Sequence, residues 1–363
     1  MNEVVHIITT ICLGGAEKQL VTLMKEQVRS GRKVTVVYLK GSPELENAIL
    51  HSGSNLVKSV ANLHPIIQIF KIRKFLSRHK KIIIHAHLPR AELLSFFVQR
   101  RFKIVITRHN SEKFFPKAPR VVSKLLSRLV FTRAAHTVAI SEAVKKFLTD
   151  SKEIADITNL SVVHYGFEVS TVFQNNQDYR IDELANVKFL IGTVARLVPQ
   201  KDLETLIEAF AIFVGQNGNA KLLIVGDGHL KQHLVSHSSH LGVANKIIWF
   251  GRVENIPAVI RTLDIFALTS LYEGFGLVLL EAMAEGIPIV ASRNSAIPEV
   301  LGEEYEGLFE TGNAVMLAKH FEMASDPNVS LRMKTYLTSR MEMFEPRRMS
   351  EEIDAVYSRL EIL

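Results

Sequence analysis

The chain has 363 residues, of which 47% are hydrophobic and 22% are charged, and its formal net charge is +7. This composition excludes a disordered chain, and the length favours two domains over a single core. No apolar run reaches the ~18 residues that a transmembrane helix needs. The N-terminal residues lack a signal-peptide layout and Cys12 is the only cysteine, so we expect a cytoplasmic protein without an internal disulfide.

Charge is distributed unevenly along the chain. Residues 1–170 contain 27 Lys and Arg against 12 Asp and Glu, whereas residues 171–363 contain 17 against 25. A basic first half and an acidic second half are consistent with two domains, the first of which meets an anionic partner. No aromatic–basic RNA-binding motif accompanies the basic residues, so nucleic acid is not the expected partner.

The first half alternates short β-rich runs with amphipathic helical patterns. We expect strands at residues 4–10, 33–39, 82–85, 104–107, 137–140 and 162–163, and helices at 16–30, 65–79, 89–100, 119–133 and 141–149. Such alternation predicts a parallel sheet with helices on both faces.

Residues 166–186 interrupt this pattern, and the polar run at 174–178 is the best linker candidate. The alternation then restarts, with strands at 188–194, 221–225, 246–250, 265–268 and 287–291 and helices near 202–216, 229–241, 276–285, 313–325 and 329–343. The prediction is an α/β protein with two doubly wound, Rossmann-like domains, 1–168 and 169–345. A C-terminal helix at 346–363 would follow, with the potential to cross back to the first domain.

Gly14 and Gly15 lie between the first predicted strand and the first helix. Small residues there allow a phosphate or sugar to approach the backbone, although an ordinary turn has the same chemistry. The segment is not Gly-x-Gly-x-x-Gly, and no Gly-Lys-Ser/Thr occurs, so dinucleotide and P-loop sites are disfavoured.

Two helical segments of the first half, 66–81 and 120–133, combine an apolar face with several Lys and Arg. Either could pack its apolar face on the sheet or lie on an anionic bilayer. The basic excess of the whole domain makes the two interpretations about equal.

His109 follows a predicted strand and can hydrogen-bond a substrate hydroxyl or position a proton. His85 and His87 lie two apart without a nearby third ligand, so structural hydrogen bonding is favoured over a metal pair. No Asp-x-Asp motif occurs, and we expect no dedicated carboxylate site for a divalent metal.

Arg196 and Lys201 flank a proline-containing loop that begins a helix. A guanidinium fork and an ammonium at a helix N-terminus make a diphosphate cradle, with a solvated loop as the alternative. Gly226 and Gly228 follow the next strand and suit a turn beside a nucleotide, but they are also common turn residues.

Residues 270–290 are the most informative segment. Glu273 lies in a glycine-flanked loop, and Glu281 lies eight positions later on the helix that this loop opens, so both can face one side. Carboxylates accept hydrogen bonds from paired hydroxyls, and a helix N-terminus attracts an anion. A polyol that carries a phosphate would fit such a site.

These motifs, in this order, resemble those of the family 4 glycosyltransferases, which are retaining nucleotide-sugar transferases of the GT-B fold. The resemblance covers nearly the whole chain. It includes Gly14-Gly15-Ala16-Glu17, His109, residues 139–142, 192–201, 225–228 and 250–251, Glu273-x₇-Glu281, Pro288 and Pro298-Glu299.

The resemblance implies specific roles and two sheets that face one interdomain cleft. His109, Arg196, Lys201 and Glu273 would be the catalytic residues, with His109 and Glu273 at the donor sugar. The other donor-binding residues would be Gly14, Gly15, Gly226, Gly228, Gly274, Phe275, Gly276, Leu277 and, at the ribose, Glu281. No metal or other cofactor is expected, because fixed cations stabilise the leaving diphosphate.

Three positions depart from the family pattern. Tyr165 precedes Gly166 where the family often has Asn, and Thr269 stands where Pro often precedes Ser270. Residues 294–296 replace a common Gly-Gly pair.

The expected function is transfer of a sugar from a UDP- or GDP-sugar to a lipid-linked or cell-surface glycan, as in lipopolysaccharide, O-antigen or capsule biosynthesis. The enzyme would be cytoplasmic, with peripheral attachment to the inner face of the plasma membrane. The alternatives are a soluble transferase that acts on a small acceptor or a storage glucan, and a non-enzymatic nucleotide-sugar sensor.

Overall fold

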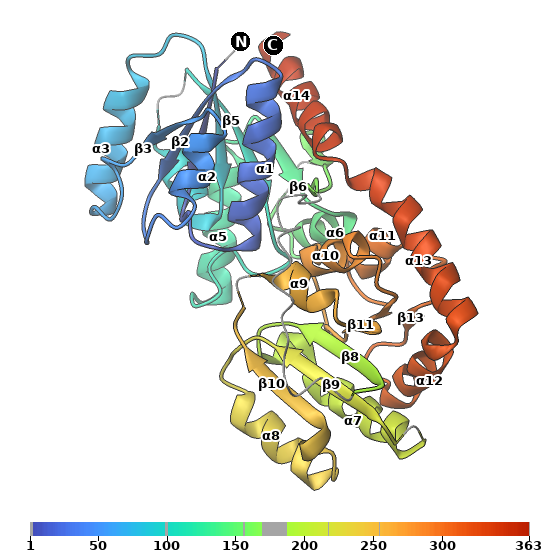
Figure 1. Cartoon of the computed structure of the whole chain (residues 1–363). Coiled ribbons are helices and arrows are strands. Elements are labelled where there is room, and N and C mark those ends of the chain that lie inside the picture. Colours follow the sequence, from blue (N-terminus) through green and yellow to red (C-terminus); the bar gives the residue numbers. More distant parts are fainter. Residues whose placement is uncertain are drawn as a thin grey trace. The chain divides into compact units, whose positions relative to one another are not determined.

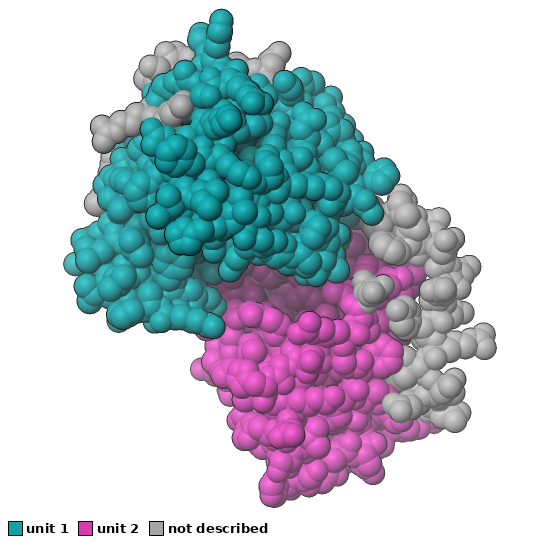
Figure 2. Space-filling view, turned by 90° about the vertical axis from the view of Figure 1, so that its left-hand side faces the viewer, with its two compact units in different colours: residues 1–168, 344–363 teal, residues 169–343 magenta. Residues whose placement is uncertain are grey.

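A computed structural model describes residues 3–98, 101–154, 157–168, 187–216, 218–253 and 255–362 (Figure 1). It contains two compact units (Figure 2). Unit 1 comprises residues 1–168 and 344–363, and unit 2 comprises residues 169–343. The linker predicted at 174–178 lies outside the described residues. In the described part of the chain, no helix is both long and apolar enough to span a bilayer.

Unit 1 is built on a seven-stranded parallel sheet of order β3-β2-β1-β4-β5-β6-β7. Its strands are β1 (Glu3–Ile8), β2 (Lys33–Tyr38), β3 (Asn55–Val57), β4 (Ile83–His87), β5 (Lys103–Arg108), β6 (His136–Ala139) and β7 (Leu160–Val162). Its helices are α1 (Gly15–Arg29), α2 (Glu46–His51), α3 (Pro65–Leu76), α4 (Pro89–Phe96), α5 (Arg120–Phe131), α6 (Glu142–Asp150) and α14 (Pro346–Ile362).

Unit 2 is built on a six-stranded parallel sheet of order β10-β9-β8-β11-β12-β13. Its strands are β8 (Phe189–Val194), β9 (Ala220–Val225), β10 (Ile247–Gly251), β11 (Ile265–Leu268), β12 (Ile289–Ser292) and β13 (Leu308–Phe309). Its helices are α7 (Leu203–Gln216), α8 (Lys231–His240), α9 (Ile256–Ile260), α10 (Leu277–Ala284), α11 (Ile297–Leu301), α12 (Ala314–Ser325) and α13 (Pro327–Met341). The predicted α/β class with two parallel sheets is confirmed.

The two faces of the unit 1 sheet differ in chemistry. One face carries aliphatic side chains, including Val5, Ile84 and Ile106, in a buried cluster. Because successive strand residues point to opposite faces, His6 and His85, which are register partners on β1 and β4, lie on the other face. The sheet therefore has one largely apolar face, which also carries Arg108 at the end of β5, and one face with a buried polar centre.

The C-terminal helix α14 belongs to unit 1, where it lies beside α1 (Figure 1). Arg32 donates a hydrogen bond to Asp354 of α14 at 2.7 Å, and the backbone N–H of Phe167 donates to the Phe344 carbonyl at 2.7 Å. At Gly166 a Cβ atom would lie 2.5 Å from the Pro346 Cα, so only glycine fits at this crossing. The chain thus leaves unit 1 after β7 and returns to it at its end.

Candidate functional site

Three loops meet at the carboxyl edge of the unit 2 sheet. They follow β8, β11 and β12, which are the strands that neighbour one another at the centre of this sheet. The Leu271 N–H donates to the Gln200 carbonyl at 2.8 Å, and Asn294 Nδ2 donates to the Leu271 carbonyl at 2.6 Å. Thr269 Oγ1 donates to the Lys201 carbonyl at 2.8 Å. The loop after β11 is thus held from both sides.

Lys201 and Glu273 form an ion pair within this group of loops. Their side chains are 12% and 9% exposed, so the pair is largely removed from water. Ser270 Oγ donates a second hydrogen bond to Glu273 Oε1 at 2.6 Å. Both charges keep hydrogen-bond partners, as largely buried ionic groups require. The structure therefore brings these two predicted catalytic residues into direct contact.

Arg196 lies on the same loop as Lys201, and its side chain is exposed. Its guanidinium donates to Gln200 Oε1 at 3.2 Å, and Gln200 Nε2 donates to the Tyr272 carbonyl at 2.9 Å. Arg196 is therefore linked to the Glu273 loop through one amide side chain. An exposed guanidinium beside a buried ion pair remains accessible to an anion.

Gly226 and Gly228 support this cationic loop. A Cβ atom at Gly226, where φ is +133°, would lie 1.9 Å from the Ala195 carbonyl oxygen, and one at Gly228 would lie 2.3 Å from the Leu197 carbonyl oxygen. Only glycines allow the loop after β9 to approach the Arg196 loop so closely. The contact explains both glycines without a ligand, so their predicted donor contact stays a prediction.

Helix α10 begins directly after the Glu273 loop. Gly276, at φ +91°, precedes its first residue, Leu277, and Phe275 is buried against the core. Gly274 completes this turn, and Glu281 lies on α10 itself, partly exposed. A helix N-terminus beside the Arg196–Lys201 loop favours bound negative charge.

The remaining predicted site residues belong to unit 1. Gly14 and Gly15 mark the start of α1, where a Cβ at Gly14 would lie 2.3 Å from a carboxylate oxygen of Glu17. His109 directly follows β5. The expectation that the two sheet edges face one cleft stays a prediction.

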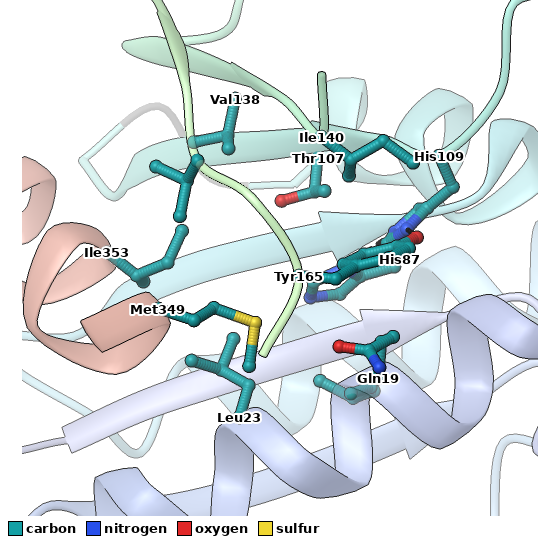
Figure 3. Close-up of a pocket in the computed structure, with 12 residues that line it drawn as sticks. Gln19, Leu23, His87, Thr107, His109, Val138, Ile140, Tyr165, Met349 and Ile353 are labelled. Atoms are coloured by element: carbon teal, nitrogen blue, oxygen red, sulfur yellow. Dashed lines mark hydrogen bonds between the residues drawn. The ribbon is translucent and has the colours of Figure 1, made fainter. Parts of the chain in front are cut away.

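His109 belongs to a chain of largely buried side chains that the sequence did not predict, and Figure 3 shows three of its members, His87, His109 and Tyr165. The His109 Nδ1 lies 2.5 Å from the Tyr165 hydroxyl and its Nε2 lies 3.1 Å from His87 Nδ1. The chain continues from His87 Nε2 to His6 Nδ1 at 3.0 Å, and from His6 Nε2 to Gln27 Oε1 at 2.8 Å. Both ring nitrogens of His109 are therefore engaged within unit 1.

His85 joins the same polar centre by a branch. Its Nδ1 lies 2.6 Å from the Tyr357 hydroxyl and its Nε2 lies 2.6 Å from Thr107 Oγ1. Gln27 Nε2 donates to the same Tyr357 hydroxyl at 3.4 Å. The polar centre thus draws on four strands or strand ends and on helices α1 and α14.

Burial determines the protonation of these histidines. Loss of hydration lowers the pKa of His109 to about 3, with a smaller contribution from the Arg108 charge, and it lowers the pKa of His6 to about 4. Burial, followed by the neighbouring histidines, also holds the pKa of His85 and His87 well below its usual range. All four imidazoles are neutral near pH 7. Burial raises the pKa of the Tyr165 hydroxyl, so it too is neutral.

The nitrogens of His6, His85 and His87 lie within 4.8 Å of one another, a spacing that would suit a metal ion. However, every ring nitrogen of the three already has a protein hydrogen-bond partner. A metal would have to displace several of these contacts, so the donor set does not fit a resident ion. The contacts match the hydrogen-bonding interpretation of His85 and His87.

Sequence reasoning missed His6, Gln27 and Tyr357 as members of this centre. His6 had a detectable signal, because it lies on the first strand at the position parallel to His85. Gln27 and Tyr357 had none, since they lie on helices separated by 330 residues and meet only in the folded unit.

Comparison with known proteins assigns both halves of the chain. Residues 13–170 match the family model described as Glycosyltransferase Family 4, and residues 175–338 match the model described as Glycosyl transferases group 1.

Relatives and solved structures are similar over nearly the full length. The chain is 23% identical to the capsular polysaccharide biosynthesis glycosyltransferase CapM of Staphylococcus aureus, over 98% of this chain and 97% of CapM. It is 24% identical, over 97% of both chains, to a Campylobacter jejuni α-1,4-N-acetyl-D-galactosaminyltransferase named for an undecaprenol-linked glycan. Anabaena HepE, solved with UDP and glucose, superimposes with a TM-score of 0.82 at 19% identity, over 99% of this chain and 100% of HepE.

Proposed function

Because the chain belongs to the family 4 glycosyltransferases of the GT-B fold, we propose that it transfers a sugar from a UDP- or GDP-sugar to a glycan acceptor. The observation that carries this proposal is the largely buried Lys201–Glu273 pair beside exposed Arg196. Cations and a carboxylate in one place can hold a diphosphate and a sugar hydroxyl together.

The donor would be held by unit 2. Arg196, Lys201 and the N–H groups at the start of α10 would bind the diphosphate, and Glu281 would accept hydrogen bonds from the ribose hydroxyls. Glu273 would bind the sugar while it keeps Lys201 in place. The UDP and glucose bound by HepE support UDP-glucose as the first donor to test.

We further propose that the reaction retains the anomeric configuration. As the bond between the anomeric carbon and the diphosphate oxygen breaks, its electron pair passes to the diphosphate, where Arg196 and Lys201 stabilise the negative charge. The acceptor hydroxyl oxygen would bond to the anomeric carbon from the side that the diphosphate leaves, and its proton would pass to the departing diphosphate oxygen. No divalent metal is needed in this scheme, because preorganised cations supply the stabilisation, and the loss of one such group costs ~10²–10³ in rate.

The test is transfer activity of Arg196→Ala and Glu273→Ala. We expect kcat/KM to fall by about 10²-fold or more in each variant, for the same reason. Lys319→Ala is the matched control, because it removes an exposed cation from α12 of the same unit. Full activity in either site variant would contradict the proposal. NMR of the anomeric proton of the product tests retention, and activity in EDTA tests independence from metals.

The acceptor is proposed to be a lipid-linked glycan at a membrane surface. CapM is a capsular polysaccharide biosynthesis enzyme, and the Campylobacter relative is named for an undecaprenol-linked glycan. Product analysis with undecaprenol-linked and water-soluble acceptors separates this proposal from a soluble transferase on small acceptors or storage glucans. Hydrolysis or transfer of any nucleotide-sugar would contradict a pure sensor.

Helix α5 supports peripheral attachment to an anionic bilayer, because its burial is inverted. It buries Ser123 and Ser127, while Val121 and Leu125 are 70% and 59% exposed. Ser127 faces inward because it hydrogen-bonds Glu153 at 2.6 Å and receives a bond from buried Arg108 at 3.3 Å. This buried ionic group takes the inner face of the helix and leaves the valine and leucine outside.

Helix α3 has a similar outer face, with Ile66 64% and Phe70 75% exposed next to Lys71 and Lys74. Exposed apolar side chains among cations are the chemistry of interfacial helices on anionic lipid. The exposed apolar faces of α3 and α5 therefore support contact with a bilayer rather than with water alone. We propose the cytoplasmic leaflet of the plasma membrane as the location.

Flotation with vesicles tests this attachment. We expect the protein to float with vesicles that contain anionic lipid, to stay behind with zwitterionic vesicles, and to be released by salt. Val121→Asp with Leu125→Asp should weaken flotation, whereas Leu331→Asp, at an apolar position of α13 that is 65% exposed, should not. Equal flotation of all three proteins would contradict the assignment of α5.

A further inference from the structure

We propose that Gln27, His6 and His87 are positioning residues that fix the tautomer of His109, with Gln27 setting the direction of the whole hydrogen-bond chain. The inference rests on the proposed function only in taking His109, which the family resemblance places at the donor sugar, as part of the transfer site. The hydrogen-bond chain itself stands on distances within unit 1.

The direction follows from the donor and acceptor inventory. A neutral imidazole has one N–H donor and one acceptor nitrogen. Gln27 donates through Nε2 to the Tyr357 hydroxyl, so its Oε1 faces His6 as an acceptor. His6 must therefore carry its proton on Nε2, which leaves its Nδ1 to accept.

Each later link repeats this choice. His87 donates from Nε2 to His6 Nδ1 at 3.0 Å, and His109 donates from Nε2 to His87 Nδ1 at 3.1 Å. His109 Nδ1 then accepts from the Tyr165 hydroxyl at 2.5 Å. All three imidazoles carry the proton on Nε2, and no link has two donors or two acceptors facing each other.

Reversal of the chain has a definite cost. If His109 carried its proton on Nδ1, His87 and His6 would have to switch as well, and His6 Nε2 would face Gln27 Oε1 as a second acceptor. Two acceptors in contact in a buried site leave both unsatisfied. Rotation of the Gln27 amide would restore that link only if the Tyr357 hydroxyl donated to the Gln27 carbonyl and His85 moved its proton to Nδ1, so the direction of the hydrogen-bond chain is tied to the orientation of the Gln27 amide.

Burial keeps water from replacing the hydrogen bonds that fix these tautomers. His6 and Gln27 are completely buried, and His87 is 2% exposed. A cavity of about 20 Å³ lies beside His87, His109 and Tyr165, and it is otherwise lined mainly by apolar side chains such as Leu23, Val138 and Ile353 (Figure 3). This space has room for about one water molecule.

Tyr165 is the last member of the hydrogen-bond chain, at the end opposite Gln27. Tyr165 stands where the sequence pattern departs from the family, and its hydroxyl is the donor that caps His109. If the direction is set at Gln27, the Tyr165 hydroxyl completes the chain without determining it. This distinction makes the proposal testable from both ends.

The experiment is nitrogen NMR on the full-length protein labelled with ¹⁵N-histidine, with ring signals assigned by single His→Asn variants. In the unchanged protein at pH 7.5 we expect the Nε2–H tautomer at His6, His87 and His109. Gln27→Met, which removes the acceptor, should give mixed tautomers at His109 and a fall in kcat of about tenfold. Gln27→Glu, which keeps an acceptor toward His6, should restore the single tautomer and most of kcat.

Two further variants complete the design. Tyr165→Phe should leave His109 as Nε2–H, because the direction comes from the other end. Gln68→Met is the matched control, since Gln68 is a fully buried amide on α3 that bonds the Leu39 and Val60 carbonyls, outside the histidine chain. It should change neither the tautomers nor kcat.

A wild-type His109 in the Nδ1–H form, or tautomers that follow Tyr165→Phe and ignore Gln27→Met, would overturn the proposal. If Gln27→Met does not fold, the wild-type and Tyr165→Phe spectra still decide between the two directions. If the three histidines show the Nε2–H tautomer but the protein transfers no sugar, the proposed function is contradicted and the direction of the hydrogen-bond chain still stands.

Discussion

His109 and His6 differ from exposed histidines because burial removes most of their hydration and no carboxylate among the described residues pairs with them. Burial is the main reason that their pKa values lie at about 3 and about 4. In the unfolded chain a histidine titrates near 6.5. The unfolded state therefore binds more protons than the native state below this pH. The resulting stability is fully present above pH 6.5 and is lost as the pH falls toward the native values.

We therefore expect unit 1 to be acid-labile. Its free energy of unfolding should fall below pH 6.5 by up to ~1.4 kcal/mol per pH unit for each buried histidine. Urea unfolding followed by circular dichroism at pH 7.5, 6.5 and 5.5 measures this slope. His6→Gln should reduce it, whereas His51→Gln, at an exposed position, should not. An unchanged slope in His6→Gln would show that the acid sensitivity arises elsewhere.

Residue identities alone predicted part of the site. Lys201 and Glu273 could be placed at the same sheet edge because each follows a predicted strand and parallel strands end at one edge, but their ion pair was not predicted. The role of Gln27 could not be predicted, since a glutamine on an amphipathic helix gives no periodic signal. Its partners come from β1 and α14, and only the tertiary fold brings them together.

At the scale of elements, length decided what could be predicted. The longer helices begin and end within a few residues of the expected positions; α1, for example, spans Gly15–Arg29. Helices α2, α9 and α11 and strands β3 and β13 were not predicted, and none exceeds six residues. Such segments are too short to complete a periodic pattern, so their conformation depends on the neighbours they pack against.

Helix α13 owes its start to a local signal. Asp326 accepts hydrogen bonds from the N–H groups of Asn328 and Val329 at 2.8 and 3.1 Å, and Pro327 occupies the first helical position. We expect Asp326→Ala to destabilise unit 2 by about 1 kcal/mol, because it removes this cap. Trp249, the only tryptophan, lies on β10 of unit 2, so its fluorescence in urea reports this unit. Asp326→Asn should retain most of the stability, and equal losses in both variants would mean that the charge, not the cap, is what matters.

At the scale of the whole molecule, unit 1 is discontinuous in sequence. Met349, Ile353, Val356, Tyr357 and Leu360 of α14 are all buried. Burial of one such large apolar side chain contributes about 1.5–3 kcal/mol to the free energy of unfolding. The sum over these side chains is comparable to the total stability of an ordinary domain.

A chain that ends at Met343 should therefore lose unit 1 and keep unit 2. Hydrogen exchange followed by mass spectrometry should show fast exchange in β1 and β4 of this truncated chain. The urea transition reported by Trp249 should be largely unchanged. Protected β1 and β4 peptides in the truncated chain would show that α14 is dispensable for unit 1.

The return of the C-terminal helix to unit 1, where it crosses Gly166, also determines the order in which the two units can fold during translation. A ribosome delivers residues in order, and most domains close as soon as they emerge. Here the first 168 residues emerge without their final helix, and α1 waits with an uncovered flank while all of unit 2 is translated. The part of the polypeptide that is made first is therefore the part that matures last.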